Sequence, residues 1–185
     1  SAFAACGDVA RDDLLAAAQA VVGANNSGGF GLPMWVSFLD ETGKVCHVLN
    51  SAGTNGKNPG SGISWQGSRS IAVQKANTAT AFSLDGYSIA TGNLYTPVQS
   101  PNSGFSIFGM GGRGTGNLQG LSDANPTDFR KAYAGPYKDW GSKKDPMKGT
   151  RPGGTNTFGG GLALYNAAGA KIGAIGVSGD TSCTD

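Results

Sequence analysis

The stretch "PMWVSFLDETGKVCHVLN", residues 33–50, decides the fold. Two apolar-rich runs flank the turn sequence DETG (residues 40–43), in which Gly43 suits the positive φ of a tight turn. Successive side chains of a strand point to opposite faces, so strict alternation places His47 and Cys46 on opposite faces of the second run. The stretch therefore predicts a β-hairpin.

A second hairpin is predicted near the end of the chain, in "GGGLALYNAAGAKIGAIGVSG", residues 159–179, with its turn at residues 166–169. Two segments have the apolar spacing of helices: one follows Asp8, and the other covers about residues 68–84 with Ser68 or Ser70 as its cap. The expected fold is an α+β domain whose antiparallel sheet is built from two hairpins and backed by helices.

Composition points to a single domain with an uncharged polar surface. The chain has 185 residues, of which only 14% are charged and 32 are glycine, so Ser, Thr, Asn and Gly must cover much of the surface. Such surfaces, and a start of "SAFAACGD" that looks like a processed N-terminus, predict a periplasmic or secreted protein.

No apolar run approaches the roughly 20 residues of a membrane span. No basic stripe is interleaved with aromatic residues, so nucleic acid is not an expected partner.

Residues 108–157 have no regular periodicity and carry most of the positive charge. They contain eight Lys/Arg and four Asp, a net +4 in a chain of net +2. A stretch of this length inside a domain indicates a Gly-rich, basic insertion, either a solvated loop or a segment that docks on a protein partner.

The three cysteines are Cys6, Cys46 and Cys183. Because domain termini are often close in space, we expect a Cys6–Cys183 disulfide in an oxidising compartment, with Cys46 left as the thiol.

Three segments resemble the GlcG–HbpS family of haem-binding proteins, which includes the C-terminal domain of PduO-type proteins. They are "VSFLDETGKV" (36–45), "SIAVQKANTATAF" (70–82) and "GGGLALYNAAGAKIGAIGVSGDTSCTD" (159–185), in the family's order. The resemblance implies one compact α+β domain over residues 1–185 that forms a homo-oligomer and binds haem or another flat ligand. Some members are described as haem-degrading. Family members usually continue into a final helix, which would start here at Ser182, so that helix is apparently missing.

Several residues are candidates for binding such a ligand. His47 is the single histidine and hence the expected metal ligand of a haem iron. Lys75 matches the lysine of the family's helix and shares a strip with two further candidates, Thr78 and Phe82. The remaining candidates lie around the second hairpin and are Gly160, Gly161 and Ser178. We expect the pocket between the helix at 68–84 and the sheet, or at a subunit interface.

Hydrolytic and zinc chemistry find little support. One histidine and no Gly-x-Ser-x-Gly motif leave no convincing triad. Zinc needs three or four ligands, and the expected disulfide uses up the supply of Cys and His. The expected function is therefore binding of haem or a flat cofactor without a hydrolytic site, and catalytic residues are not identified. The alternative is a cofactor-free accessory subunit that docks on a larger partner through residues 108–157.

Overall fold

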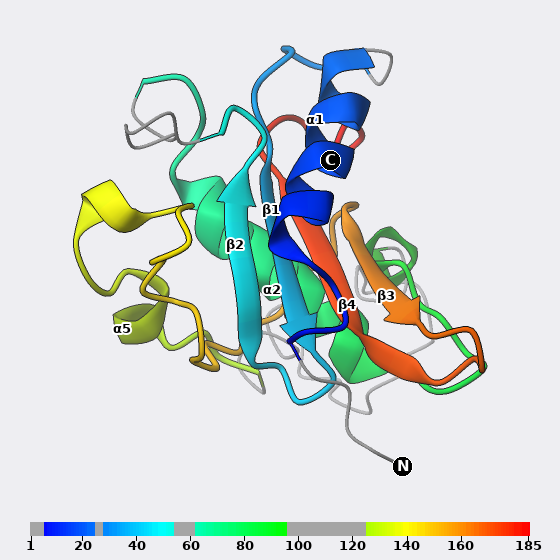
Figure 1. The fold of residues 1–185 in the computed structure, drawn as a ribbon. Helices are drawn as coiled ribbons and strands as arrows, with labels where there is room; N and C mark the ends of the chain where they lie inside the picture. Colours follow the sequence, from blue (N-terminus) through cyan, green and yellow to red (C-terminus); the bar gives the residue numbers. More distant parts are fainter. Residues whose placement is uncertain (1–5, 25–27, 54–61, 96–124) are drawn as a thin grey trace, which may run out of the picture.

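The computed structural model describes residues 6–24, 28–53, 62–95 and 125–185. Its centre is a four-stranded antiparallel sheet in the order β2-β1-β4-β3 (Figure 1). The strands are β1 (Trp35–Asp40), β2 (Val45–Asn50), β3 (Gly161–Tyr165) and β4 (Lys171–Ser178). Both hairpins are confirmed, and they join through the β1–β4 pair. The predicted α+β class is confirmed as well.

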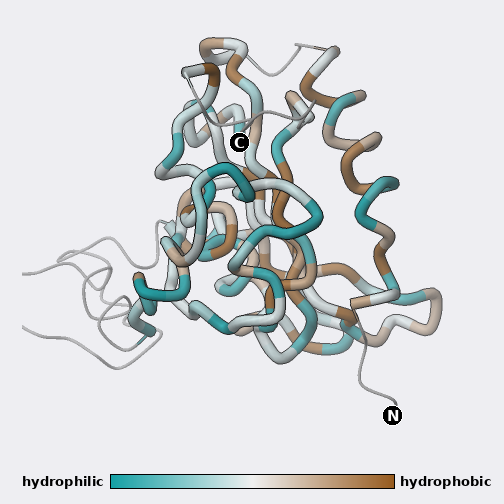
Figure 2. Tube along the Cα trace, turned by 60° about the vertical axis from the view of Figure 1, so that its left-hand side comes forward, coloured by the Kyte–Doolittle hydropathy of each residue, from teal (hydrophilic) through white to brown (hydrophobic). Residues whose placement is uncertain are grey.

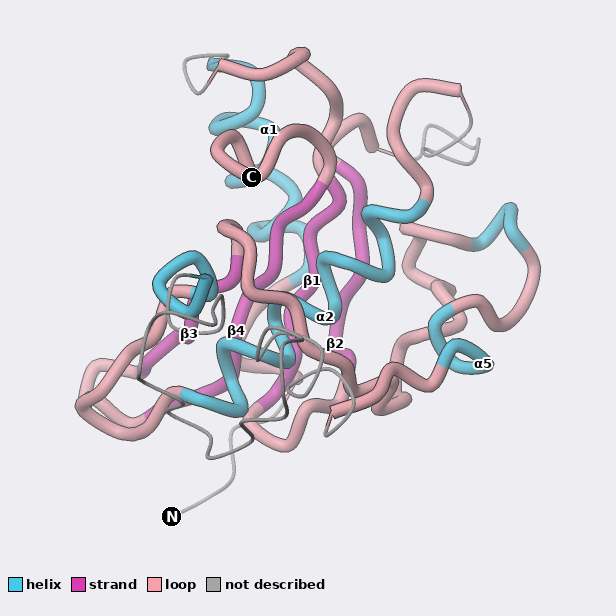
Figure 3. The backbone as a smooth tube through the Cα atoms, turned by 180° about the vertical axis from the view of Figure 1, so that it is seen from behind, coloured by secondary structure: helices cyan, strands magenta, loops and turns pink. Residues whose placement is uncertain are grey.

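Helix α2 (Gly67–Phe82) packs on one face of the sheet, which we call the inner face, as the view from behind shows (Figure 3). The contact is close because small residues meet there. A Cβ atom on Gly176 of β4 would overlap the backbone of Ala72. Helix and strand therefore touch directly, and this part of the interface has no room for the flat ligand that the sequence led us to expect between them.

Helix α1 (Arg11–Ala24) lies across part of the opposite, outer face (Figure 1). Hydrophobic and hydrophilic residues alternate along it (Figure 2), and none of its residues is fully buried. Its apolar side chains cover a small cluster formed by Val36 of β1, Leu49 of β2 and Met34, which precedes β1. Because α1 packs on only part of the four-stranded sheet, any further contacts to the outer face must come from other segments.

Residues 125–157 of the predicted insertion contribute to the main core. They include the short helices α5 (Phe129–Ala132) and η2 (Tyr137–Asp139), and Trp140 and Met147 pack in the cluster between α2 and the sheet. A fully buried Arg69–Asp145 ion pair ties this segment to α2. Residues 108–124 of the predicted insertion lie outside the described residues.

The 3-10 helix η1 (Thr91–Leu94) lies against β3. Within the described ranges, no helix combines the length and the apolar character needed to cross a membrane.

The β1–β2 hairpin contains a β-bulge that the alternation pattern did not predict. Phe38 pairs with His47, but the next residue, Leu39, pairs with Val45, so Cys46 is the extra residue. Val45 consequently packs in the inner core. Cys46 and His47 both contact the segment before α1, so the expectation that they point to opposite faces is wrong.

Candidate functional site

A row of side chains crosses the outer face of all four strands, next to the part that α1 covers. Strand pairing aligns His47 with Phe38, Phe38 with Ile175, and Ile175 with Leu162. Partners in antiparallel strands share a face, so these four residues form one continuous row. With strands about 4.8 Å apart, the row spans roughly 14 Å.

The two ends of this row differ in exposure. Phe38 is fully buried and His47 is half-buried, whereas Leu162 is 45% exposed. Figure 1 shows the segment before α1 passing in front of the sheet, and β3 lies at the edge of the sheet beside β4. The row thus combines a covered imidazole with an open apolar edge.

The His47 ring is held through one nitrogen only. Its Nε2 lies 2.8 Å from the carbonyl oxygen of Val9, and because a carbonyl only accepts, Nε2 carries the proton and donates. Nδ1 therefore presents its lone pair, and this atom is buried without a hydrogen-bond partner in the described part of the chain. A histidine that ligates a metal commonly donates its other ring N–H to a backbone carbonyl in this way.

The electrostatic surroundings keep the imidazole neutral. Burial lowers the pKa of His47, and this effect outweighs the opposing effect of the hydrogen bond to Val9. The cationic Lys148 and Arg11 lower the pKa further. His47 is thus a neutral potential ligand, with the cations Lys148 and Arg11 and the anion Asp12 nearby.

The N-terminal arm, residues 6–10, is fastened over this end of the sheet by a disulfide between Cys6 and Cys46. The predicted Cys6–Cys183 pairing is wrong, because the bulge turns Cys46 toward the arm; Cys183 is an exposed free thiol. The disulfide, the Val9 carbonyl and a hydrogen bond of 2.7 Å from Arg11 Nη2 to the Gly141 carbonyl hold this part of the chain.

Three of the other candidate residues meet at a second place, the end of β4. Lys75 donates from Nζ to Asp185 Oδ2 at 2.7 Å and to the Val177 carbonyl at 3.0 Å. Ser178 Oγ lies 3.3 Å from the same carboxylate oxygen, and Gly160 is packed against the Lys75 Nζ.

The backbone completes the surroundings of this carboxylate. The amides of Gly179 and Asp180 each donate to Asp185 Oδ1 at 2.9 Å. Burial lowers the pKa of Lys75, although Asp185 opposes this change. The anion that pairs with Lys75 is therefore the carboxylate of Asp185.

The remaining candidates support packing around α2. A Cβ atom on Gly161 would overlap Thr91, so this glycine lets β3 and η1 approach closely. Thr78 Oγ1 donates to the Gln74 carbonyl and accepts from the Asn156 amide, each at 2.8 Å. Phe82, the last residue of α2, is half-buried. The structure therefore brings Lys75, Gly160 and Ser178 together but keeps them apart from His47 on the outer face.

A pocket of about 120 Å³ lies between α1, residues 28–34 and the end of β4. Its walls are mainly apolar, with Asp180 and Asp185 at its rim. Both carboxylates are already engaged, Asp180 by the amides of Phe30 and Leu32. Ligand pockets usually have about 300–1,000 Å³, so this one suits a small apolar group and not a whole flat cofactor.

Sequence reasoning missed Val9, Arg11 and Asp185 as parts of these sites. Val9 acts through its carbonyl group, which leaves no side-chain signal. Asp185 had a signal, since a buried lysine requires a nearby anion, but several carboxylates were equally available to it.

No family model matches the chain, and no curated protein matches it significantly. Solved structures do match. The crystal structure of a PduOC–haem complex, in which PduOC is the PduO C-terminal domain, is similar with a TM-score of 0.52 and 21% identity, over 95% of this chain and 86% of that chain. The Klebsiella pneumoniae protein ORFY, of the family DUF336, has a TM-score of 0.48 and 19% identity, over 92% of this chain and 79% of that one. The chain therefore has the fold of the PduO C-terminal domain, the fold that its sequence resemblance predicted.

Proposed function

We propose that the protein binds haem, or a similar flat ligand that carries carboxylates, on the outer face of the sheet with His47 as the iron ligand. The observation that carries this proposal is the state of His47: a neutral imidazole whose Nε2–H donates to Val9 and whose buried Nδ1 has no partner in the described structure. A structural neighbour that was crystallised with haem supports the choice of ligand.

The residues around His47 suit the other parts of such a ligand. Arg11 and Lys148 are the nearby cations that would pair with propionates. Ile175 and Leu162, the accessible residues of the row, would contact the apolar macrocycle. Bound haem would supply a redox-active iron, and haem degradation remains a property implied only by the sequence resemblance.

The cluster around Lys75 is the second proposed contact for a carboxylate. Lys75 and Ser178, with Gly160 beside them, already surround the carboxylate of Asp185. A propionate would enter only by displacing Asp185, which makes this cluster the weaker candidate. Gly161, Thr78 and Phe82 would then contribute only by shaping the surroundings of Lys75.

A haemin titration followed by the Soret band tests the proposal. We expect saturation near one haem per chain, and we expect His47→Ala to shift the band and to weaken binding at least tenfold. Lys144→Ala, a change at an exposed lysine, is the control and should bind like the wild type. A His47→Ala protein with an unchanged band and affinity would refute His47 as the ligand.

The alternative is a cofactor-free accessory subunit, and one observation favours it. Within residues 125–157 the aromatic side chains of Phe129, Tyr133 and Tyr137 are 68%, 52% and 37% exposed. Exposed aromatic groups of this kind are common in protein interfaces. If no saturable Soret band forms, this reading becomes the preferred one.

Two further properties belong to the proposal. Exposed Leu162 beside half-buried Ile175 supports association of copies of the chain through the outer face, and Leu162→Lys should then lower the mass measured by light scattering.

The Cys6–Cys46 disulfide supports an oxidising compartment, as expected for a periplasmic or secreted protein.

A further inference from the structure

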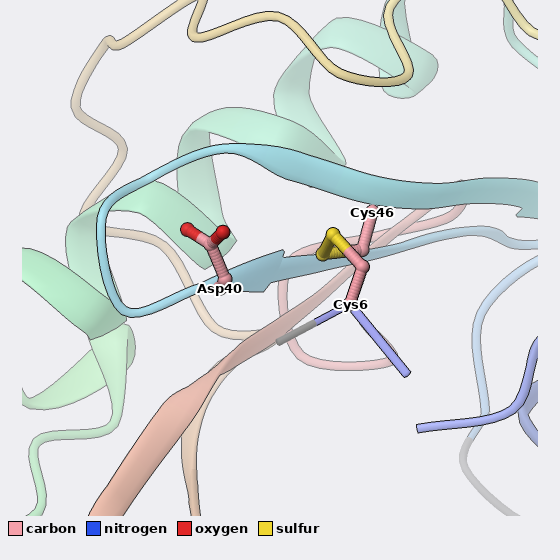
Figure 4. A group of neighbouring side chains, drawn as sticks. All are labelled: Cys6, Asp40 and Cys46. Carbon is pink, nitrogen blue, oxygen red and sulfur yellow. A yellow bond between two sulfur atoms is a disulfide. The ribbon is translucent and has the colours of Figure 1, made fainter. Parts of the chain in front are cut away.

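The disulfide lies directly beside a buried carboxylate. Asp40 is the last residue of β1, and one of its carboxylate oxygens lies within 4.8 Å of the sulfur atoms of both Cys6 and Cys46. Figure 4 shows Asp40 and Cys46 on the two strands of the hairpin, with Cys6 reaching the pair from the N-terminal arm. Cys46 and Asp40 are 0% and 3% exposed, and Cys6 is half-buried.

The two oxygens of Asp40 have different surroundings. Oδ1 accepts three hydrogen bonds from the hairpin turn: Thr42 N at 2.9 Å, Thr42 Oγ1 at 2.7 Å and Lys44 N at 3.0 Å. Among the residues that the structure describes, the cation next to Oδ2 is Lys44 Nζ at 3.4 Å, from a side chain that is 37% exposed. The turn thus fixes the carboxylate through one oxygen and leaves the other available.

We propose that reduction of the Cys6–Cys46 disulfide creates a binding site for Zn²⁺, with the two thiolates and the Asp40 carboxylate as protein ligands. Zinc accepts this combination, with Zn–S near 2.3 Å and Zn–O about 2.0–2.2 Å, and water would complete a tetrahedral set. The bulge supports the proposal, because it turns Cys46 toward Asp40 and the arm.

The reduction is an exchange with a dithiol. One thiolate of the dithiol attacks one sulfur of the disulfide, which breaks the Cys6–Cys46 bond, expels one cysteine as a thiolate and leaves the other in a mixed disulfide with the dithiol. The second thiolate of the dithiol then attacks the dithiol's own sulfur in this mixed disulfide and expels the second cysteine. The dithiol becomes a cyclic disulfide, and its two hydrogens end on Cys6 and Cys46 as two thiols. Binding of Zn²⁺ then releases both thiol protons to solvent.

Cobalt titration of the reduced protein tests this site. The protein carries Cys183→Ser, so that the exposed thiol cannot contribute, and the reductant is removed without air before Co²⁺ is added. We expect one Co²⁺ per chain with a thiolate charge-transfer band, loss of the band on adding Zn²⁺, and no band in the oxidised protein. Asp40→Asn, with both cysteines retained, should weaken Co²⁺ binding at least tenfold, and Cys6→Ser/Cys46→Ser should abolish the band.

Two results would overturn the proposal: no thiolate–cobalt band in the reduced protein, or equal Co²⁺ affinity with and without Asp40. Because Asp40→Asn could disturb the hairpin, X-ray absorption of the reduced Cys183→Ser protein with Zn²⁺ provides a second measurement. We expect two sulfur neighbours and two oxygen neighbours, and a shell of three or more sulfurs, or none, would contradict the site.

Discussion

Replacement of Lys75 by methionine should destabilise the protein strongly. The Lys75 and Asp185 side chains are 1% and 4% exposed, and 2.7 Å separates the two charged atoms. Methionine keeps most of the apolar volume but leaves the Asp185 carboxylate buried without its cation. Removing one partner of a buried ion pair typically costs about 3–5 kcal/mol. With a urea m-value of about 2–3 kcal/mol per molar, the unfolding midpoint should fall by roughly 1–2.5 M.

Two variants separate the ion pair from other effects. Lys143→Met breaks an exposed pair with Asp12, whose side chains are 71% and 70% exposed, and should cost about 0–1 kcal/mol. The double variant Lys75→Met/Asp185→Asn removes the uncompensated charge and should recover at least about 2 kcal/mol. A Lys75→Met protein within about 1 kcal/mol of the wild type, or a double variant no more stable than the single one, would refute this reasoning.

Three further predictions concern packing, pH and a second buried pair. Gly176→Ala should lower the unfolding free energy by at least about 3 kcal/mol, because the added methyl group would overlap the α2 backbone. Gly67→Ala is the control: a Cβ there would have no atom within 4 Å, so this change should not destabilise the protein. Urea unfolding measures both variants. The folded state holds the pKa of His47 below the unfolded value of about 6.5, so the unfolded chain binds a proton at this residue more readily than the folded one. The free energy of unfolding should therefore fall as the pH drops below 6.5, and it should fall more for the wild type than for His47→Gln. Thermal unfolding across pH 5–8 measures this difference. Arg69→Lys loses the two-pronged contact with Asp145 and should cost about 2–4 kcal/mol; a change below 1 kcal/mol would contradict that role.

The hairpins were predictable because their signals are local. Gly43 and Gly169 both have positive φ, as the turn sequences required, and the flanking strands follow the alternation of apolar residues. The close contact between α2 and the sheet depends on small residues, because a Cβ on Gly176 would overlap the backbone of Ala72 and Ala76.

The disulfide and the partner of Lys75 could not be derived in the same way. A single extra residue in β2 turns Cys46 toward the N-terminal arm, and bulges of this kind have no reliable sequence signature. The pairing of Lys75 with Asp185 joins residues 110 positions apart in the chain, so it depends on how α2 and the end of β4 meet. His47 was identified as a candidate, but the carbonyl group that sets its protonation was not.

A crystal structure of the protein with bound haemin, with the iron located by anomalous scattering, tests the central claim most directly. We expect iron within bonding distance of a His47 nitrogen, on the outer face of the sheet, and propionates near Arg11 and Lys148. Iron located away from His47, for example beside the Lys75 cluster, would contradict the proposal that His47 is the iron ligand.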